Sequence, residues 1–537
     1  MVLVPPEILK LIFNNLVETT VESPFFPGGL KNLSKDSIKN LLSCALSSGA
    51  LFDPAIRVLW HTMELPTILR LLPDFTIMNG THNLTGDVDY DDHTLKRFDI
   101  YSSKVRHLAL YGPASKQILI HNFVYTRLAL ARPRPLPFLT HLYCYGSPFS
   151  DKTIFAISPS LRYASFFQCH FSEILLYLSV AKKESELQLL DLSYCLGNEP
   201  TLPSISKSIS QLIHLRSLHL IFRNLPGCVS LDLRPLGRLA LLESLRLEIH
   251  VPNTKIESSI IQDFSDGVPR SLKQLTLYLD DPSASLASTV PQFYQHSPVV
   301  TYSIIGFLKS EQFATVFAAI PSQWQGTLTK LLVSACGPME IDPPRSLRSS
   351  LIEPLYSLCV LQDVEIREFG SALFANDDDI SKICHAWPDL VNLLLDVSSD
   401  SETVGRLPTV ASFKPIIATL CPQMESLEIP LDVVRLPAVD EIHSRSEAAT
   451  SSSGTSHDLH LLHLNIDRAD FDQCSSGSGP TNLAYHLDMA FPFLRLVEVN
   501  HGVGKGRIRL GWKAWKAVID IMVLCQDVRR RYQEELK

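Results

Sequence analysis

A short pattern of spaced leucines, LxxLxL, recurs along most of this chain about every 30 residues. Its clearest copies are LRSLHL, LESLRL and LKQLTL, which begin at Leu215, Leu242 and Leu272, 27 and 30 residues apart. Looser copies, with other apolar residues at some positions, begin at Val105, Leu139, Leu161, Leu187, Val299, Leu328, Leu361, Leu390, Met424, Leu459 and Leu494. Such a repeat indicates a stacked array of similar units rather than one compact globule.

Within each copy, apolar residues alternate with other residues, which is typical of a β-strand with one buried face. The fourth and sixth residues of a copy should point into the core, and the third, fifth and seventh should point outward. The stretch after each copy is long enough to return as a helix. One unit cannot bury its leucines alone, so neighbouring units must stack. We therefore predict an α/β solenoid, with a curved parallel sheet on the concave side and helices outside.

The composition suits such a core. Hydrophobic residues make up 45% of the 537 residues, and the mean hydropathy is +0.11. A chain of this length exceeds what one hydrophobic core accommodates. The 11 cysteines include no CxxC pair, which favours reduced, buried thiols over disulfides or a zinc site.

A different pattern precedes the repeats and predicts a group of short helices. VPPEILKLIF should begin a helix at its paired prolines. Asp53 and Pro54 have the residue types of an N-cap and a first helical position, so a third helix should begin there. The apolar residues expected on one face of the first and second helices are Ile8, Leu11, Ile12 and Leu16, and Ile38, Leu41, Leu42, Ala45 and Leu46.

Four segments carry a family resemblance: VPPEILKLIF, LLSCALSSGALFDPAIRVLW, LPTILRLLP and LKRFDIYSSKVRHLAL. The first two resemble the two halves of an F-box, and the last two are similar to the region that follows it in the large F-box family of mushroom-forming fungi. The later copies resemble irregular leucine-rich repeats, because Cys169, Cys195 and Cys336 stand where that pattern allows Asn or Cys. The chain departs from the F-box pattern at Ser48 to Phe52, where an aromatic residue is usual, and by an insertion at about Val17 to Asp36.

The resemblance implies a substrate receptor of an SCF-type cullin-RING ubiquitin ligase, which does no chemistry itself. Its F-box would dock a Skp-type adaptor and, through it, a cullin, while its repeats would hold an unknown protein substrate. The adaptor contacts that the resemblance implies are Pro5, Pro6, Ile8, Leu9, Ile12, Phe13, Leu42, Cys44 and Leu46. Two alternatives stay open: these residues only cap the solenoid, or the chain is a leucine-rich repeat scaffold with a degenerate, non-docking F-box.

The predicted domain order follows from these patterns. The domains are an F-box-like helical domain at 1–66, a linker and first cap at 67–104, the repeat solenoid at 105–510 and a C-terminal capping helix at 511–537. Small polar residues at 444–458 and 473–481 predict flexible loops within the solenoid.

The outward residues of the repeats form the surface on which a substrate would bind. Early copies contribute aromatic residues and later ones acidic residues, so we expect aromatic anchors near Tyr143 and Tyr163 and an acidic region that selects a basic segment. The alternative is a solvated face without a partner. The candidate residues are His107, Tyr111, His141, Tyr143, Tyr145, Tyr163, Phe167, His219, Arg246, Tyr278, Asp363, Glu365, Asp396 and Glu428.

No catalytic motif, cofactor or metal site is predicted. HGVGKGR, from His501 to Arg507, lacks the GxxxxGK[ST] spacing of a phosphate loop, and His460 and His463 should face opposite sides of a strand. The net charge of −8 and the pI near 6.1 argue against nucleic-acid binding. We find no secretory leader and no apolar run of membrane-spanning length, so we expect a protein of the cytoplasm or nucleus that binds no membrane.

Overall fold

The computed structural model describes residues 5–17, 19–21, 31–78, 81–84, 91–111, 119–146, 154–195, 202–223, 234–250, 270–279, 284–306, 315–320, 322–335, 352–369, 376–397, 408, 420–430, 461–465, 479–490, 496–499 and 508–535. The chain consists of two compact units, unit 1 (Met1–Val251) and unit 2 (Pro252–Lys537). Both combine parallel strands with helices, which gives the mixed α/β, solenoid-like architecture that the leucine pattern predicts.

Unit 1 begins with a helical group that has its own core. Its helices are α1 (Pro6–Leu16), α2 (Lys35–Ser47) and α3 (Gly49–Leu59), and an antiparallel pair, β1 (Thr19–Val21) and β2 (Lys31–Leu33), lies between α1 and α2. The sequence did not predict this strand pair. The core is formed by Phe13, Leu41, Ala45, Ala55, Ile56 and Val58.

The start predicted for the third helix is wrong. α3 begins at Gly49, where the Ser48 hydroxyl accepts a hydrogen bond from the Ala50 amide at 3.3 Å. Pro54 lies inside the helix and is buried, and Asp53 forms ion pairs with Arg57 and Lys104 instead of capping. Burial of Pro54 beside Ala55 offsets the backbone hydrogen bond that proline cannot donate.

The sheet of unit 1 is parallel and follows the predicted repeats. Its strands, in spatial order, are β3 (Thr62–Glu64), β6 (His107–Tyr111), β8 (His141–Tyr145), β9 (Tyr163–Phe167), β10 (Leu189–Ser193), β11 (Ser217–Arg223) and β12 (Ser244–His250). Equivalent residues of successive repeats pair without a shift. β3 is an additional strand that the leucine pattern did not predict, and it places Met63 beside Leu108.

The sheet of unit 2 has the same construction. Its strands are β13 (Gln274–Leu279), β14 (Thr301–Gly306), β15 (Lys330–Ala335), β16 (Asp363–Phe369), β17 (Asn392–Val397), β18 (Ser426–Pro430), β19 (Leu461–Asn465) and β20 (Leu496–Val499). They are parallel, and equivalent residues again pair, except that the register shifts between Ile366 and Phe369. Each predicted copy therefore supplies one strand, which confirms the strand positions.

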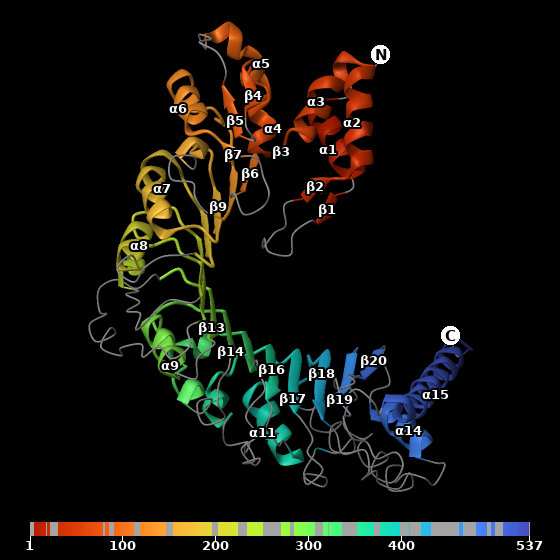
Figure 1. The fold of residues 1–537 in the computed structure, drawn as a ribbon. Helices are drawn as coiled ribbons and strands as arrows, with labels where there is room; N and C mark the ends of the chain where they lie inside the picture. Colours follow the sequence, from red (N-terminus) through yellow and green to blue (C-terminus); the bar gives the residue numbers. More distant parts are fainter. Residues whose placement is uncertain are drawn as a thin grey trace. The chain divides into compact units, whose positions relative to one another are not determined.

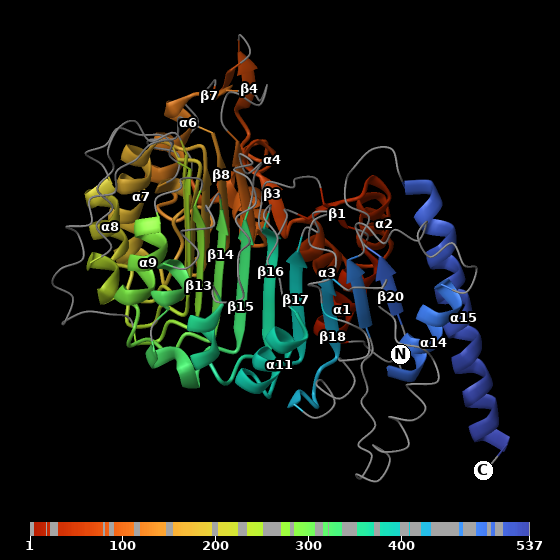
Figure 2. The ribbon, with the colours of Figure 1, turned by 90° about the horizontal axis from the view of Figure 1, so that it is seen from below.

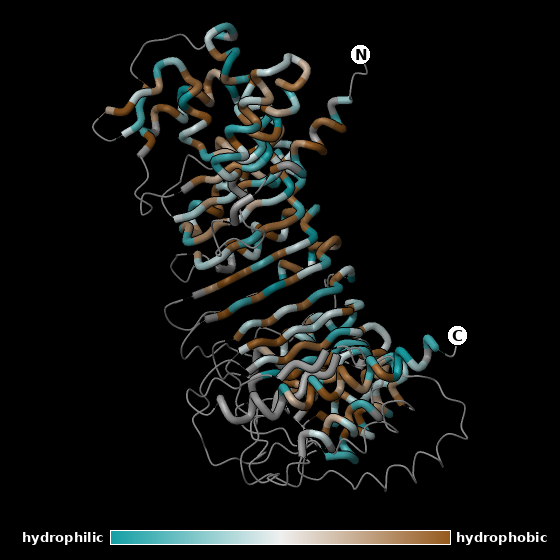
Figure 3. Tube along the Cα trace, turned by 90° about the vertical axis from the view of Figure 1, so that its right-hand side faces the viewer, coloured by the Kyte–Doolittle hydropathy of each residue, from teal (hydrophilic) through white to brown (hydrophobic). Residues whose placement is uncertain are grey.

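The apolar residues of the repeats fill the interior as predicted. Leu215, Leu218 and Leu220, the first, fourth and sixth residues of one copy, are at most 2% exposed, and their equivalents in unit 2, such as Leu328, Leu331 and Val333, are fully buried. Figure 3 shows hydrophobic and more polar residues alternating along the strands. Burial of this row in the repeats whose side chains the structure describes is a large source of stability, because a fully buried leucine contributes about 1.5–3 kcal/mol relative to an exposed one.

Helical segments cover one face of each sheet (Figures 1 and 2). They are α6 (Asn122–Ala131), η2 (Ile154–Ala156), α7 (Phe171–Glu184), α8 (Leu202–Ile209) and η4 (Arg234–Arg238) in unit 1, and α9 (Ala284–Phe293), η6 (Ser322–Gly326), η8 (Glu353–Ser357) and α11 (Asp377–Ala386) in unit 2. Four of these, η2, η4, η6 and η8, are short 3-10 helices. Pro235 in η4 and Pro354 in η8 are the second residues of their helices, in the first turn where proline is tolerated.

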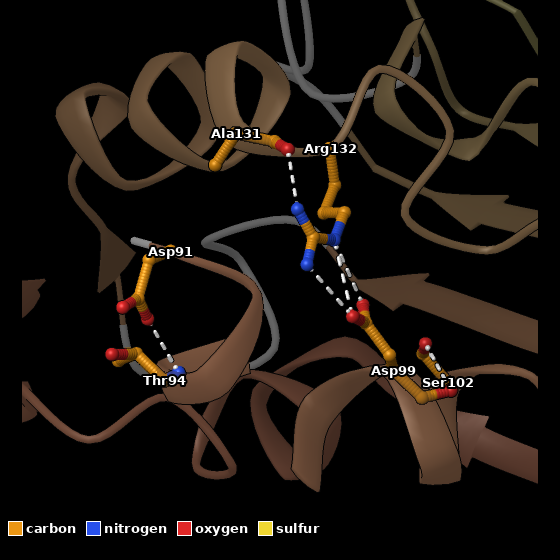
Figure 4. A network of polar contacts seen from close by, with 6 residues as sticks. All are labelled: Asp91, Thr94, Asp99, Ser102, Ala131 and Arg132. Carbon is orange, nitrogen blue, oxygen red and sulfur yellow. Dashed lines mark hydrogen bonds and ion pairs between the residues drawn. The ribbon is translucent and has the colours of Figure 1, made fainter. Parts of the chain in front are cut away.

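The linker region of unit 1 contains a second, small sheet. Its elements are α4 (Leu65–Leu69), β4 (Phe75–Met78), β5 (Thr81–Leu84), α5 (Asp92–Ser102) and β7 (Leu119–Ile120). The Arg132 guanidinium ties α5 to the end of α6: its Nε lies 3.1 Å from both carboxylate oxygens of Asp99, and its Nη2 lies 2.9 Å from one of them (Figure 4). Asp91 caps α5 by accepting a hydrogen bond from the Thr94 amide at 2.7 Å.

Unit 2 ends in two packed helices, α14 (Gly479–Ala490) and α15 (Ile508–Glu535). α15 covers most of the segment predicted as a C-terminal helix, and its Val518 and Met522 are buried. Arg529 of α15 lies 2.5 Å from the carboxylate of Asp488, which is buried on α14. Of the predicted loops, 444–458 lies outside the described residues, and the last residues of 473–481 begin α14.

In several repeats the eighth residue has a positive φ angle. It is either the last residue of the strand or the one that follows it. These residues are Gly146 (φ 73°), Gln168 (φ 54°), Tyr194 (φ 55°) and Gly306 (φ 158°). A left-handed conformation costs a residue other than glycine about 1–2 kcal/mol. Gln168 and Tyr194 are held there in part by backbone hydrogen bonds, from Gln168 to Ser193 at 3.0 Å and from Tyr194 to Ile221 at 2.9 Å.

Five cysteines of the repeats are buried thiols, as the sequence predicts, whereas Cys359 is exposed; the buried ones are Cys144, Cys169, Cys195, Cys384 and Cys421. The Sγ atoms of Cys169 and Cys195 lie 3.5 Å from the Phe167 carbonyl oxygen and 3.4 Å from the Phe166 carbonyl oxygen. Burial raises the pKa of both thiols, and the described cysteines are all free. Cys336 lies outside the described residues.

Candidate protein-interaction surfaces

α1 turns a different face inward from the one predicted. Leu9 and Phe13 pack against the core of the helical group, and Phe13 is only 6% exposed. Ile8, Leu11 and Ile12 are 46%, 58% and 43% exposed. Apolar residues occur on both faces of this helix, so periodicity alone cannot select the inner one, and the large Phe13 ring is the better filler of a core shared with α2 and α3.

α2 also exposes apolar residues that were expected inside. Its buried residues include Leu41 and Ala45, whereas Ile38, Leu42 and Leu46 are 37%, 41% and 84% exposed and follow one another at intervals of one helical turn. We call the exposed residues Ile8, Leu11, Ile12, Ile38, Leu42 and Leu46 the aliphatic surface of α1 and α2.

Most residues predicted to contact an adaptor are therefore accessible. Ile8, Ile12, Leu42 and Leu46 belong to the aliphatic surface, and Pro5 is also exposed. Leu9 and Cys44 are half-buried against the core and Phe13 is buried within it, so Phe13 cannot be a contact unless α1 moves. The side chain of Pro6 lies outside the described residues. Leu11 and Ile38 were missed as candidates because both were assigned to the inner faces.

The helical group is attached to the sheet of unit 1 by charged and aromatic contacts. Asp53 of α3 forms an ion pair with Lys104, which follows α5, and a second one with Arg57 at 2.6 Å. Partial burial raises the pKa of Asp53, but hydrogen bonds from Lys104 and Arg57 outweigh it and hold the pKa below its usual value. The rings of Trp60 and Tyr101 lie 4.7 Å apart.

The outward residues of unit 1 pack closely against one another. Adjacent strands of a sheet are only about 4.8 Å apart, so large rings at equivalent positions must stack. Ring centroids are 5.4 Å apart for His141 and Tyr163, 5.1 Å for Tyr143 and Tyr163, and 4.9 Å for Tyr145 and Phe167. As a result Tyr143 and Phe167 are only 6% exposed, while His107, His141, Tyr145 and Tyr163 are half-buried. The side chain of Tyr111 lies outside the described residues.

Three histidines begin this aromatic row. His107 lies 4.4 Å from His61 and 4.1 Å from His141, measured between ring centroids. Burial, with smaller contributions from His141 and His61, lowers the pKa of His107 to about 3. Burial also lowers the pKa of His141. His107 and His141 are therefore neutral at neutral pH.

We expect acid to destabilise unit 1 through His107. Unfolded His107 takes up a proton near pH 6.5, whereas folded His107 stays neutral until about pH 3, so stability is full above pH 6.5 and is lost as the pH falls below it. One such group contributes a slope of about 1.4 kcal/mol per pH unit. His107→Phe keeps a ring but cannot titrate, so its unfolding free energy should fall less steeply between about pH 6.5 and pH 4. Equal slopes in denaturant titrations of both proteins would contradict this origin.

The middle of the same face carries a buried acidic residue that the sequence reasoning missed. Asp191 is 1% exposed, and it accepts hydrogen bonds from the hydroxyls of Ser193 at 2.5 Å and Ser165 at 3.2 Å. In the row of fifth residues it lies between Ser165 and His219. Burial raises the pKa of Asp191, and its hydrogen bonds and the nearby His219 and Arg246 oppose that shift only in part.

The other charged candidates of unit 1 also interact with one another. Arg246 is exposed and donates a hydrogen bond from its Nε to Glu248 at 2.7 Å, and Glu248 is 5% exposed. His219 is half-buried, and its burial lowers its pKa despite the charges of Asp191 and Glu248.

The acidic candidates of unit 2 are partly neutralised by neighbouring cations. Asp363 lies 3.8 Å from the Lys330 ammonium and accepts a hydrogen bond from Asn392, and Glu365 forms an ion pair with Arg367. The remaining candidates differ in exposure: Tyr278 is half-buried, Glu428 is 7% exposed, and the side chain of Asp396 lies outside the described residues. A basic ligand would have to compete with these internal ion pairs.

Within the described ranges, no group of three or more His, Cys, Asp or Glu side chains is arranged to hold a metal ion. In the same part of the chain, no helix has both the length and the apolar character needed to cross a bilayer. His460 and the HGVGKGR segment lie outside the described residues.

Comparison with known proteins adds no identification, since the sequence matches no protein-family model and no curated protein.

Proposed function

We propose that this chain is the substrate-recognition subunit of an SCF-type cullin-RING ubiquitin ligase. In this proposal α1, α2 and α3 are an F-box that docks a Skp-type adaptor, and the strands are those of leucine-rich repeats that hold the protein to be ubiquitylated. The observation that carries the proposal is the aliphatic surface of α1 and α2. Six exposed aliphatic side chains on two neighbouring helices are costly in water and are typical of a surface that a partner covers.

The contacts that hold the helical group to the rest of unit 1 support the proposed receptor function. The ion pair of Asp53 with Lys104 and the contact between Trp60 and Tyr101 restrain α3 against the end of α5, just before the first repeat strand. A receptor needs such a restraint, because an adaptor bound at one end must keep a substrate held by the repeats in a defined place. A simple cap of the solenoid would instead turn a polar face to solvent.

A binding assay with a recombinant Skp-type adaptor tests the proposal. The variant Ile8→Ala, Ile12→Ala, Leu42→Ala removes three side chains of the aliphatic surface that are 46%, 43% and 41% exposed, so the fold should persist. We expect adaptor affinity to fall at least tenfold, because loss of each contact at the centre of an interface costs about 1 kcal/mol or more.

The matched control removes exposed aliphatic side chains elsewhere in unit 1. Leu130, Leu176 and Ile213 are 81%, 41% and 62% exposed and lie outside the helical group. Their replacement by alanine should leave adaptor binding unchanged. If wild-type protein fails to bind the adaptor, or both triple variants bind equally well, the F-box proposal fails and a leucine-rich repeat scaffold becomes the better description.

A further inference from the structure

Asp191 is a buried carboxylate that forms no ion pair with any described residue, and the nearby His219 and Arg246 only partly offset its burial. Only hydroxyl groups donate to it, those of Ser165 and Ser193, and the described part of the chain contains no cation within ion-pair distance. His219 is uncharged at neutral pH because burial lowers its pKa, and the guanidinium of Arg246 is bound to Glu248. Hydrogen bonds satisfy the oxygens of Asp191 but do not neutralise its charge.

This arrangement is unfavourable for folding alone. Buried charges are normally paired, because removal of an ion from water is costly. An asparagine at this position would remove the charge and keep one acceptor oxygen, and its amide group could donate to the other serine, whose hydroxyl can rotate to accept. Side chains that break such a rule without a compensating gain in the fold are expected at functional sites.

Aromatic residues flank Ser165, the strand partner of Asp191, on the outer face. Tyr163 lies two residues before Ser165. On the other side, Phe167 stacks on Tyr145 at 4.9 Å and 8° and contacts Tyr194 at 4.9 Å. Tyr145, Tyr163 and Tyr194 are half-buried, so part of each ring reaches solvent.

The backbone at Tyr194 helps to hold this ring group in place. Its φ of 55° is unfavourable for a tyrosine, yet its amide bonds to the Ile221 carbonyl at 2.9 Å. Strained residues persist only where neighbours fix them, and they cluster at binding sites. The surface formed by Asp191, Tyr145, Tyr163, Phe167 and Tyr194 is called the Asp191 surface below.

We propose that the Asp191 surface binds a lysine or arginine side chain of the captured protein. A cation is attracted both by the buried carboxylate and by the faces of tyrosine rings. These two side chains alone combine a positive charge with a stem long enough to reach a group that is 1% exposed. The inference deepens the proposed receptor function and rests on it only in taking the ligand to be a substrate protein.

Selection from a phage library of random peptides, about twelve residues long, on the immobilised full-length protein tests this proposal. The enriched peptides should share a lysine or arginine. In a representative peptide, replacement of that residue by uncharged acetyllysine or citrulline should weaken binding to wild type at least about tenfold. Asp191→Asn should weaken binding of the charged peptide by a similar factor and leave binding of the uncharged peptide unchanged. The two effects should therefore not add.

Two controls separate recognition from folding. The melting temperature of Asp191→Asn should stay close to that of wild type, because the variant removes a buried charge, keeps one acceptor oxygen and can donate from its amide group to the other serine hydroxyl. Asp527→Asn, which neutralises an ion-paired acid on α15 away from the strands, should leave peptide binding unchanged.

Several results would overturn the inference. The first is a set of enriched peptides without a shared lysine or arginine. The second is equal binding of the charged peptide by wild type and Asp191→Asn, and the third is loss of binding in Asp527→Asn but not in Asp191→Asn. Adaptor binding is scored separately and should be unchanged in Asp191→Asn. If the protein binds the adaptor but selects no peptides with lysine or arginine, this inference alone is overturned. If it selects such peptides but does not bind the adaptor, the ligase proposal alone is overturned.

Discussion

Gly306→Ala is expected to lower the stability of unit 2 by about 3 kcal/mol. Gly306 ends β14 with φ 158° and pairs with Leu279 of β13. A Cβ atom added to it would lie 1.9 Å from the Leu279 carbonyl oxygen and 2.8 Å from the carbonyl carbon. Because both atoms belong to the backbone, no side-chain rotation relieves the clash, and the two strands must separate at this point.

Hydrogen exchange of the β13 and β14 amides is the direct measurement, because long repeat arrays need not unfold in a single step. Gly326→Ala is the matched control: nothing lies within 4 Å of a Cβ atom at that position. A change of glycine to alanine at a compatible position stabilises a protein by about 0.4–1 kcal/mol. Unchanged protection of β13 and β14 in Gly306→Ala would mean that these strands do not approach as closely as the structure places them.

The strands could be predicted because their signal is local. Every predicted copy contains a strand that begins two residues after its first apolar residue, and this holds even for VVTYSI at Val299, which forms β14. Alternating burial requires only that residues four and six of a copy be apolar, and a short window of sequence shows this. β3 escaped prediction because the strand is only three residues long, so the alternation reduces to a single inward residue, Met63.

Helix orientation was harder to predict, because it depends on the partner surface. The apolar residues of α2 cover more than one face, so its periodicity does not show which of them meet α1 and α3. Leu41 and Ala45 are buried, whereas Leu42 and Leu46, one position further along, are exposed. For the same reason, the sequence did not show which apolar residues of α2 form the core and which form the exposed surface.

The charge environment of the outer face also lay beyond the sequence. Asp191 appears there as one polar residue in LDLS, and nothing local shows that Ser165, 26 residues earlier, donates to it. The register of the repeats brings these residues together. The row could have been read by aligning fifth residues of successive copies, but the burial of Asp191 depends on rings from other strands. In unit 2 the sequence overstated the charge of the outer face. Asp363 and Glu365 suggested an acidic surface, but the structure places a cation beside each of them.

Phe13→Ala should destabilise the N-terminal helical group by about 3 kcal/mol, because loss of a buried phenylalanine removes its transfer free energy and leaves a cavity. Phe13 is 6% exposed among residues of α2 and α3, whereas its neighbour Ile12 is 43% exposed. Ile12→Ala should therefore cost less than about 1 kcal/mol in stability. Hydrogen exchange of α2 and α3 separates the two effects. Both variants should bind the adaptor more weakly. In Ile12→Ala the amides of α2 and α3 should keep their full protection from exchange, whereas in Phe13→Ala that protection should be reduced. The opposite pattern of protection would restore the helix face predicted from periodicity and would remove the basis for placing the adaptor on Ile8, Leu11 and Ile12.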